Sequence, residues 1–272
     1  MRWDKGYRST NVDDRRSEGP ARGFGGGGLG GGLNILALAA RFGWKGILVA
    51  IVLITAMTYG GVCSGSSPSH QSAVPTAPQK GANDETSSFV GYVLDDVQKT
   101  FAREVAGYKL TRLTLFRGSI SSACGTATAA VGPFYCPVDN KVYIDLAFYD
   151  DLRERFGAPG DFAQAYVIAH EVGHHVQNQN GLLGRGEVNQ IEIELQADCL
   201  AGAWAKDASA RGLVEIGDVD EALNAASQIG DDTIQRKTSG RVQPETWTHG
   251  SAAQRSGSFK TGLDGGVAAC GI

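Results

Sequence analysis

Apolar side chains recur at helical spacing over residues 89–106, and this pattern predicts a helix with a single apolar stripe. The stripe contains Val90, Val93, Leu94, Val97, Phe101 and Val105. Residues 109–116 change to strand-like alternation, with Leu110, Leu113 and Leu115 as candidate core positions. We therefore expect a folded domain to begin near Phe89, with a helix followed by a strand.

A β-hairpin is expected next. Residues 134–138 and 141–144 have the composition of strands, and Asp139-Asn140 between them is a two-residue turn signal. Residues 147–156 and 218–230 predict two further helices, whereas residues 236–244 are expected to form a mobile linker.

Two helices are predicted at residues 162–177 and 187–206. The second has an apolar stripe made of Ile191, Leu195, Cys199 and Ala203. The turn between them is rich in helix breakers, namely Gly181, Gly184 and Gly186. A short connection of this kind favours an antiparallel helix pair, and helices beside a small sheet predict an α+β fold.

The first of these helices carries the H-E-x-x-H pattern at His170, Glu171 and His174. Residues four apart lie on one helix face, so both imidazoles can bind one Zn²⁺ while Glu171 leans over the metal. Glu194 on the following helix could supply the third ligand and leave a fourth position for water. Asp198, one turn further on, could hold a histidine ring by its free N–H.

Three other assignments for these residues are less favoured. A core helix whose histidines are only hydrogen-bonded would leave Glu171 unexplained in an apolar environment. His175 is rotated by about 100° from His174, so we do not expect it to bind the same ion. Glu192 is a rival third ligand, but it points to a different helix face from Glu194.

With H-E-x-x-H followed by E-x-x-x-D, the sequence resembles a zincin of the glutamate-ligand type. More closely, it resembles the bacterial family of neutral zinc metallopeptidases. The resemblance runs from about Phe89 to the C-terminus and is carried by residues 124–125, 132–137, 141–145, 170–177, 229–232 and 248–255. It implies a zincin-like metalloprotease domain, a Zn²⁺ cofactor and a peptide or protein substrate that pairs with the strand before the active-site helix.

Residues 248–255 are also similar to a C-terminal motif of membrane-bound CAAX-type and heat-shock-type zinc proteases, in which a His and an Arg approach the active site. Ser251 and Gln254 form a capping box, so a helix should start at Ser251. His249 could stabilise an oxyanion or simply pack in a loop. Arg255 could contact substrate or form an ion pair with Asp198, Asp231 or Asp232.

The chain of 272 residues has a formal net charge of −4 and a sequence pI near 5.7, which gives no indication of nucleic-acid binding. Its first 45 residues are nevertheless basic and contain a glycine run at 23–32, so they are expected to form an unstructured tail. Residues 63–88 have the Ser/Pro/Gln/Ala composition of a flexible stalk.

Residues 46–62 contain no charge and predict one transmembrane helix near the lower length limit. The basic tail before them would keep residues 1–45 in the cytoplasm and export the stalk and the domain at 89–272. A cleaved signal peptide would need a shorter basic region, so an uncleaved anchor is favoured. The shorter apolar run at 33–40 could lie at the interface.

Export would suit the cysteines. Cys124 and Cys136 flank a loop that a disulfide could close, and Cys199 could pair with Cys270, which leaves Cys63 alone. The alternative, structural zinc binding by these cysteines, has no C-x-x-C spacing to support it.

The sequence therefore predicts a membrane-anchored, extracytoplasmic zinc peptidase in which Glu171 acts as the general base towards a metal-activated water. Two other functions stay open. One is a catalytically silent scaffold that binds envelope proteins, although an intact Glu171 argues against it. The other is a zinc amidase acting on a cell-wall substrate, which would differ only in the shape of its pocket.

Overall fold

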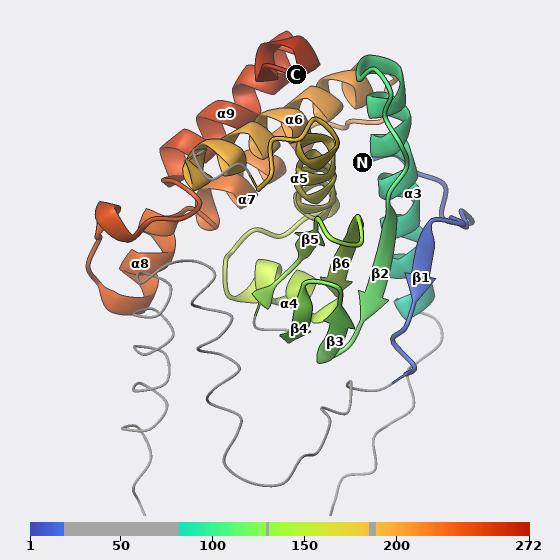
Figure 1. Cartoon of the computed structure of the whole chain (residues 1–272), viewed down its shortest axis with the longest axis horizontal. Coiled ribbons are helices and arrows are strands. Elements are labelled where there is room, and N and C mark those ends of the chain that lie inside the picture. Colours follow the sequence, from blue (N-terminus) through green and yellow to red (C-terminus); the bar gives the residue numbers. More distant parts are fainter. Residues whose placement is uncertain (19–81, 129–130, 185–188) are drawn as a thin grey trace, which may run out of the picture. The chain divides into compact units, whose positions relative to one another are not determined.

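A mixed four-stranded sheet with the order β1-β2-β6-β5 forms one side of the fold (Figure 1). β1 (Val12–Asp14), β2 (Arg112–Phe116) and β6 (Lys141–Asp145) run parallel, and β5 (Phe134–Cys136) is antiparallel to β6 at the edge. Leu113 pairs with Val142 and Leu115 with Ile144, and all four side chains are fully buried. This computed structural model describes residues 1–18, 82–128, 131–184 and 189–272.

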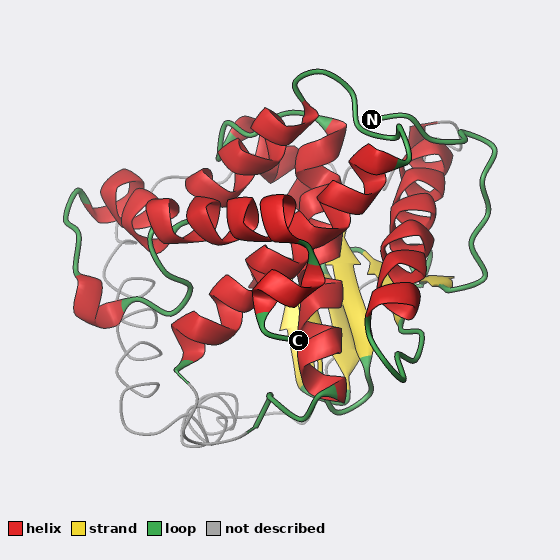
Figure 2. Cartoon of the chain, turned by 90° about the horizontal axis from the view of Figure 1, so that it is seen from above, coloured by secondary structure: helices red, strands yellow, loops and turns green. Residues whose placement is uncertain are grey.

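The helices surround the strands on more than one side, as the view from above shows (Figure 2). They are α3 (Ala82–Glu104), α4 (Ala147–Glu154), α5 (Asp161–Gln179), α6 (Gln190–Ala210), α7 (Asp218–Gln228), α8 (Asp231–Ser239) and α9 (Ala252–Gly265), with two short 3₁₀ turns at Pro244–Thr246 and Val267–Cys270. α6 and α9 touch backbone to backbone at two glycines. A Cβ on Gly202 would lie 1.9 Å from the Phe259 carbonyl oxygen, and one on Gly262 would lie 1.8 Å from that of Cys199.

The first residues of the chain belong to this folded unit. β1 pairs with β2, the Trp3 ring packs edge-on against Phe89 at 5.2 Å, and the α-ammonium of Met1 donates to Asp161 at 2.7 and 2.9 Å. The prediction of an unstructured tail at residues 1–45 is therefore wrong for residues 1–18. Val12–Asp14 pair with β2, Met1 is buried, and Trp3 and Val12 pack against the core.

The start of the domain also differs from the prediction. α3 begins at Ala82, so residues 82–88 are helical and are not part of a flexible stalk, and Ser88 is buried. The predicted transmembrane helix at 46–62, the rest of the stalk and Cys63 lie outside the described residues. Among the residues that are described, no helix is both long enough and apolar enough to cross a membrane.

Most predicted elements are present. The hairpin turns at Asn140, which has a φ of 57°, and α4, α5, α6, α7 and the capped start of α9 lie where the patterns indicated. Leu110, however, is 61% exposed and not in the core. The linker predicted at 236–244 is wrong in its first part, because α8 continues to Ser239 and ends at Gly240 in the left-handed region. α8 buries none of its residues, so it has no apolar stripe to reveal it.

Both predicted disulfides are confirmed. Cys124–Cys136 joins the turn of a separate hairpin, β3 (Ser119–Ser122) with β4 (Gly125–Thr128), to the edge strand β5. Cys199–Cys270 joins α6 to the C-terminal 3₁₀ turn. The two bridges therefore fix the edge strand and the C-terminal segment to the domain.

Candidate metal centre

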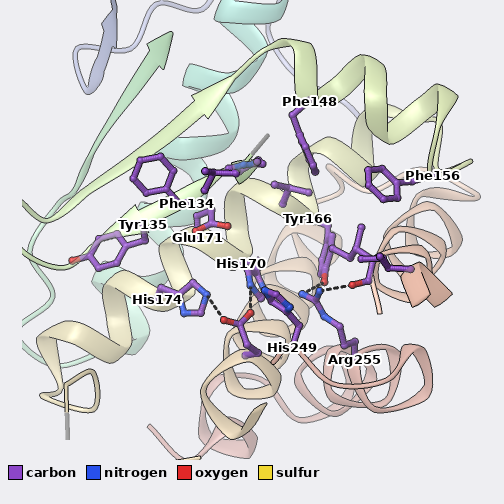
Figure 3. A pocket seen from close by; sticks show the side chains of 17 residues that line it. Phe134, Tyr135, Phe148, Phe156, Tyr166, His170, Glu171, His174, His249 and Arg255 are labelled. Atoms are coloured by element: carbon purple, nitrogen blue, oxygen red, sulfur yellow. Dashed lines mark hydrogen bonds and ion pairs between the residues drawn. The ribbon is translucent and has the colours of Figure 1, made fainter. Parts of the chain in front are cut away.

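Three potential metal donors converge where α5 packs against α6. The Nε2 atom of His170 lies 3.2 Å from Glu194 Oε2, and that of His174 lies 3.6 Å from Glu194 Oε1. One ligand atom from each residue lies within 4.8 Å of the others. Figure 3 shows both imidazoles pointing towards the same carboxylate from one helix face. The antiparallel pairing of α5 and α6 brings Glu194 opposite His174 and Asp198 opposite His170.

These separations suit a zinc ion. Zinc binds histidine nitrogen and carboxylate oxygen at about 2.0–2.1 Å, so tetrahedral geometry places two donors about 3.4 Å apart. Gly173, between the two histidines, allows the helices to come this close, since a Cβ there would lie 3.1 Å from the Ala197 backbone. The donor set and its spacing fit Zn²⁺ with one position left for water.

The Nδ1 nitrogen of His170, the outer nitrogen that does not face Glu194, is held by a buried polar network. Its Nδ1 lies 2.8 Å from Asp198 Oδ1, which is the hydrogen bond expected from the sequence. Arg255 donates to both oxygens of Asp198, at 2.8 Å from Nε and 3.0 Å from an NH₂ group, and the hydroxyl of Tyr166 donates to Oδ1. Of the three carboxylates considered for Arg255, it pairs with Asp198, and both side chains are almost completely buried.

The outer nitrogen of His174 is held by a residue whose role was not predicted. His174 Nδ1 lies 2.8 Å from the Gln177 side-chain oxygen, and the Gln177 amide donates to the Ile193 carbonyl at 2.6 Å and to Gln196 at 3.0 Å. Gln177 is fully buried. An amide one turn after H-E-x-x-H was a signal visible in the sequence. With Nδ1 engaged in each ring, Nε2 is the atom presented to a metal.

Burial and neighbouring charges set the protonation of this centre. Burial lowers the pKa of His170, but the Asp198 and Glu194 carboxylates more than offset it and raise the pKa to about 10. Burial raises the pKa of Glu194, yet the two histidines bring it below its usual value. Because a metal needs neutral imidazole, its binding must release a proton and should weaken as the pH falls.

Glu171 lies beside the three donors and lines the same cavity, which has a volume of about 410 Å³. Its side chain is buried, with 7% exposed, and this burial raises the pKa of its carboxyl group above the usual value. No hydrogen bond to the Glu171 carboxylate is present among the described residues, so its oxygens are available within the cavity. The site thus pairs a potential metal with a buried carboxylate, which is the arrangement that general-base chemistry needs.

His249 reaches the same cavity from the loop before α9. Its ring Nδ1 lies 3.2 Å from Asp231 Oδ1, and the other oxygen of Asp231 accepts the backbone N–H groups of Thr248, His249 and Gly250 at 2.7, 2.7 and 3.0 Å. Asp231 therefore fixes the loop and, together with the Thr248 hydroxyl at 2.9 Å from Nδ1, the ring. The His249 ring is half exposed, unlike those of the α5 histidines.

The two rivals considered from the sequence lie away from the centre. Glu192 is exposed in the first turn of α6. His175 is buried on another face, where Nδ1 meets the Tyr135 hydroxyl at 2.9 Å and Nε2 meets the Lys109 carbonyl at 2.8 Å. Neither joins the donors around Glu194.

The family model described as "Putative neutral zinc metallopeptidase" matches residues 1–271. The chain belongs to this family. The match includes the N-terminal segment that forms β1, and the family description implies a zinc-dependent hydrolase, in keeping with the donor set on α5 and α6.

One relative matches over almost the whole chain and another over part of it. The chain is 40% identical to the uncharacterized protein YpfJ of Escherichia coli (strain K12) over 286 residues, which covers 98% of this chain and 96% of YpfJ. It is 46% identical over 178 residues to the uncharacterized protein Rv2575 of Mycobacterium tuberculosis (strain ATCC 25618 / H37Rv), covering 59% and 61% of the two chains. No solved structure significantly matches it.

Proposed function

We propose that the protein is a zinc peptidase that hydrolyses peptide bonds with Glu171 as its general base. The observation that carries the proposal is the buried Glu171 carboxylate beside three convergent donors in one cavity. Burying a carboxylate costs free energy. A scaffold would have no use for one here, so this observation favours an enzyme over the silent binding protein.

Each residue of the site has a distinct task in this proposal. When bound, Zn²⁺ supplies a water of lowered pKa and polarises the scissile carbonyl. Glu171 takes a proton from the attacking water and passes it to the leaving amine. His249, oriented by Asp231, donates a hydrogen bond to the oxyanion that forms from the carbonyl. Asp198 and Gln177 hold the two imidazoles in place.

The edge strand β5 is the proposed docking site for substrate. β5 pairs only with β6 among the described strands, and two of its residues, Phe134 and Tyr135, line the cavity. A peptide in extended conformation can add to such an edge through main-chain hydrogen bonds. The Cys124–Cys136 bridge holds the end of β5 in position.

The test uses the full chain, because residues 1–18 contribute β1 and residues 82–88 contribute the start of α3. The zinc-loaded protein should cleave an unfolded protein, and Glu171→Gln should reduce the rate by about 10²–10⁴-fold while retaining zinc and fold. Zinc content and the unfolding transition of both proteins serve as controls. Equal activity of the two would contradict the proposal.

We further propose that the domain lies outside the cytoplasm, because its two disulfides suit an oxidising compartment. β1 and β2 share a sheet, so residues 1–18 and 82–272 must lie on the same side of any membrane. One crossing at 46–62 would separate them. The proposal therefore does not keep the single crossing at 46–62.

This topology predicts that the segments before and after residues 46–62 are equally accessible to a reagent outside the cytoplasm. Ser17→Cys and Thr238→Cys place a thiol at two exposed positions. A thiol reagent that does not cross membranes should label both in cells whose outer envelope has been permeabilised. Labelling of one position alone would contradict the shared side, and labelling of neither would contradict the location.

A further inference from the structure

The cavity at the metal centre has two chemically different parts. His170, Glu171 and His174 line one part of it, and the apolar side chains of Phe148, Phe156, Val167 and Ile234, which we call the apolar pocket, line another. Figure 3 shows Phe148 and Phe156 on the side of Tyr166 that faces away from His174. The volume of the whole cavity, about 410 Å³, falls within the range of about 300–1,000 Å³ typical of ligand pockets.

The walls of the apolar pocket come from separate elements that are tied to one another. The rings of Phe148 and Phe156 lie 6.4 Å apart at the start and just past the end of α4. Ile234 reaches the cavity from α8, and Lys237 on the same helix donates to the Phe156 carbonyl at 3.1 Å. Asp231 holds the first turn of α8 to the His249 loop. Packing and hydrogen bonds thus connect the walls of the pocket to one another.

No charged side chain lines the apolar pocket among the described residues. The charged residues of the cavity are in the part that contains the metal donors, and Arg255 is already engaged by Asp198. A charged substrate side chain in the apolar pocket would lose its water and gain no partner, which is costly. An apolar side chain there would be removed from water, which is favourable by about 25 cal/mol per Å².

We infer that the apolar pocket is the specificity pocket of the enzyme and selects a large apolar side chain beside the scissile bond. The inference rests on the proposed peptidase function and adds its substrate class. The substrate is then a peptide with Leu, Ile, Met or Phe at one position next to the cleaved bond. Ile234 is the specificity-determining residue best suited to substitution, because it lies on a helix that buries none of its residues and is not itself a metal donor.

The experiment maps the bonds that the zinc-loaded full chain cleaves in an unfolded protein, using mass spectrometry. Large apolar residues should be enriched at one position adjacent to the cleaved bond. Ile234→Glu should lower kcat/KM for an apolar peptide by about 10–100-fold and shift the preference at that position towards Lys and Arg. Ile234→Leu should retain the original preference.

Thr238→Glu is the matched control, since it adds the same charge to an exposed position of α8 outside the cavity. It should leave the cleavage pattern unchanged, and all variants should bind zinc equally. Cleavage that depends on Glu171 but has no apolar preference, or a preference unaffected by Ile234→Glu, would overturn the specificity pocket and leave the peptidase proposal standing. Absence of any Glu171-dependent cleavage would overturn both.

Discussion

The two walls of the cavity differ in how firmly their functional side chains are held. On the α5–α6 wall, His170 and His174 are mostly buried, and each has its outer nitrogen engaged by a buried partner, Asp198 or Gln177. On the wall formed by α8 and the His249 loop, α8 buries none of its residues, and the His249 ring is 48% exposed, with Nδ1 lying 2.9 Å from Thr248 Oγ1 and 3.2 Å from Asp231 Oδ1. One wall is part of the domain core, and the other is attached to its surface.

This difference separates metal binding from turnover and selectivity. A change on the α5–α6 wall disturbs buried charges and should alter both zinc affinity and stability. Side chains on the α8 wall are exposed to water and make few hydrogen bonds. A change there should therefore alter activity while zinc binding and the fold are retained. Loops and exposed elements set on a rigid core are where enzymes commonly adjust specificity.

The largest effect should follow from loss of a donor on the buried wall. Glu194→Ala removes the carboxylate that faces both histidines, so the protein should lose stoichiometric zinc after dialysis. Glu192→Ala is the control, because it removes a carboxylate from the same helix at an exposed position. Elemental analysis of the dialysed proteins measures the metal. Full zinc in the first variant and loss in the second would reverse the donor assignment.

A matched pair of isosteric changes compares the walls directly. Asp198→Asn leaves Arg255 buried without its carboxylate, which should cost about 3–5 kcal/mol of stability, and zinc should bind about 10–100-fold more weakly. Asp231→Asn should retain zinc and stability, but lower kcat by about 10–100-fold, because the His249 ring loses the carboxylate that helps to orient it.

Zinc titration, thermal unfolding and steady-state kinetics of the two variants test this contrast. Asp231→Asn should change kcat more than KM, since His249 is proposed to act on the oxyanion and not on the bound substrate. A loss of zinc in Asp231→Asn equal to that in Asp198→Asn would mean that the two walls form one unit, and the comparison would fail.

The two walls also differ in how well the sequence predicted them. The spacing of His170, His174, Glu194 and Asp198 on helices fixes which side chains share a face, so their convergence followed from helical periodicity. α8 has no apolar stripe, and nothing in its local pattern distinguished it from a loop. The role of Asp231 was likewise invisible, because its hydrogen bonds run to residues 17–19 positions away.

The N-terminal segment was missed for a related reason. Its basic composition and the glycine run after it predicted a tail, whereas its place in the fold depends on contacts with distant residues. Met1 meets Asp161 across a separation of 160 residues, and Val12 pairs with Leu113. A strand of three residues is too short for its pattern of apolar and polar positions to predict such pairing.

The smallest predicted effect tests whether this distant contact supports the buried wall. The Met1 α-ammonium meets Asp161 at the start of α5, with Asp218 and Glu215 within 3.5 Å. Burial lowers the pKa of the Met1 amino group, but Asp161 and Asp218 more than offset this and raise it above 8.0. Because the folded-state pKa is the higher one, the contribution to stability is complete below pH 8 and is lost as the pH rises through the raised pKa.

Asp161→Asn should therefore reduce stability by about 1 kcal/mol at pH 7, which corresponds to roughly 2–4 °C in the unfolding midpoint. The gap between the two proteins should narrow as the pH is raised above 8, while zinc content at pH 7 stays the same. Thermal unfolding at a series of pH values measures both curves. If the two curves run parallel across this range, the ammonium does not contribute to stability through Asp161.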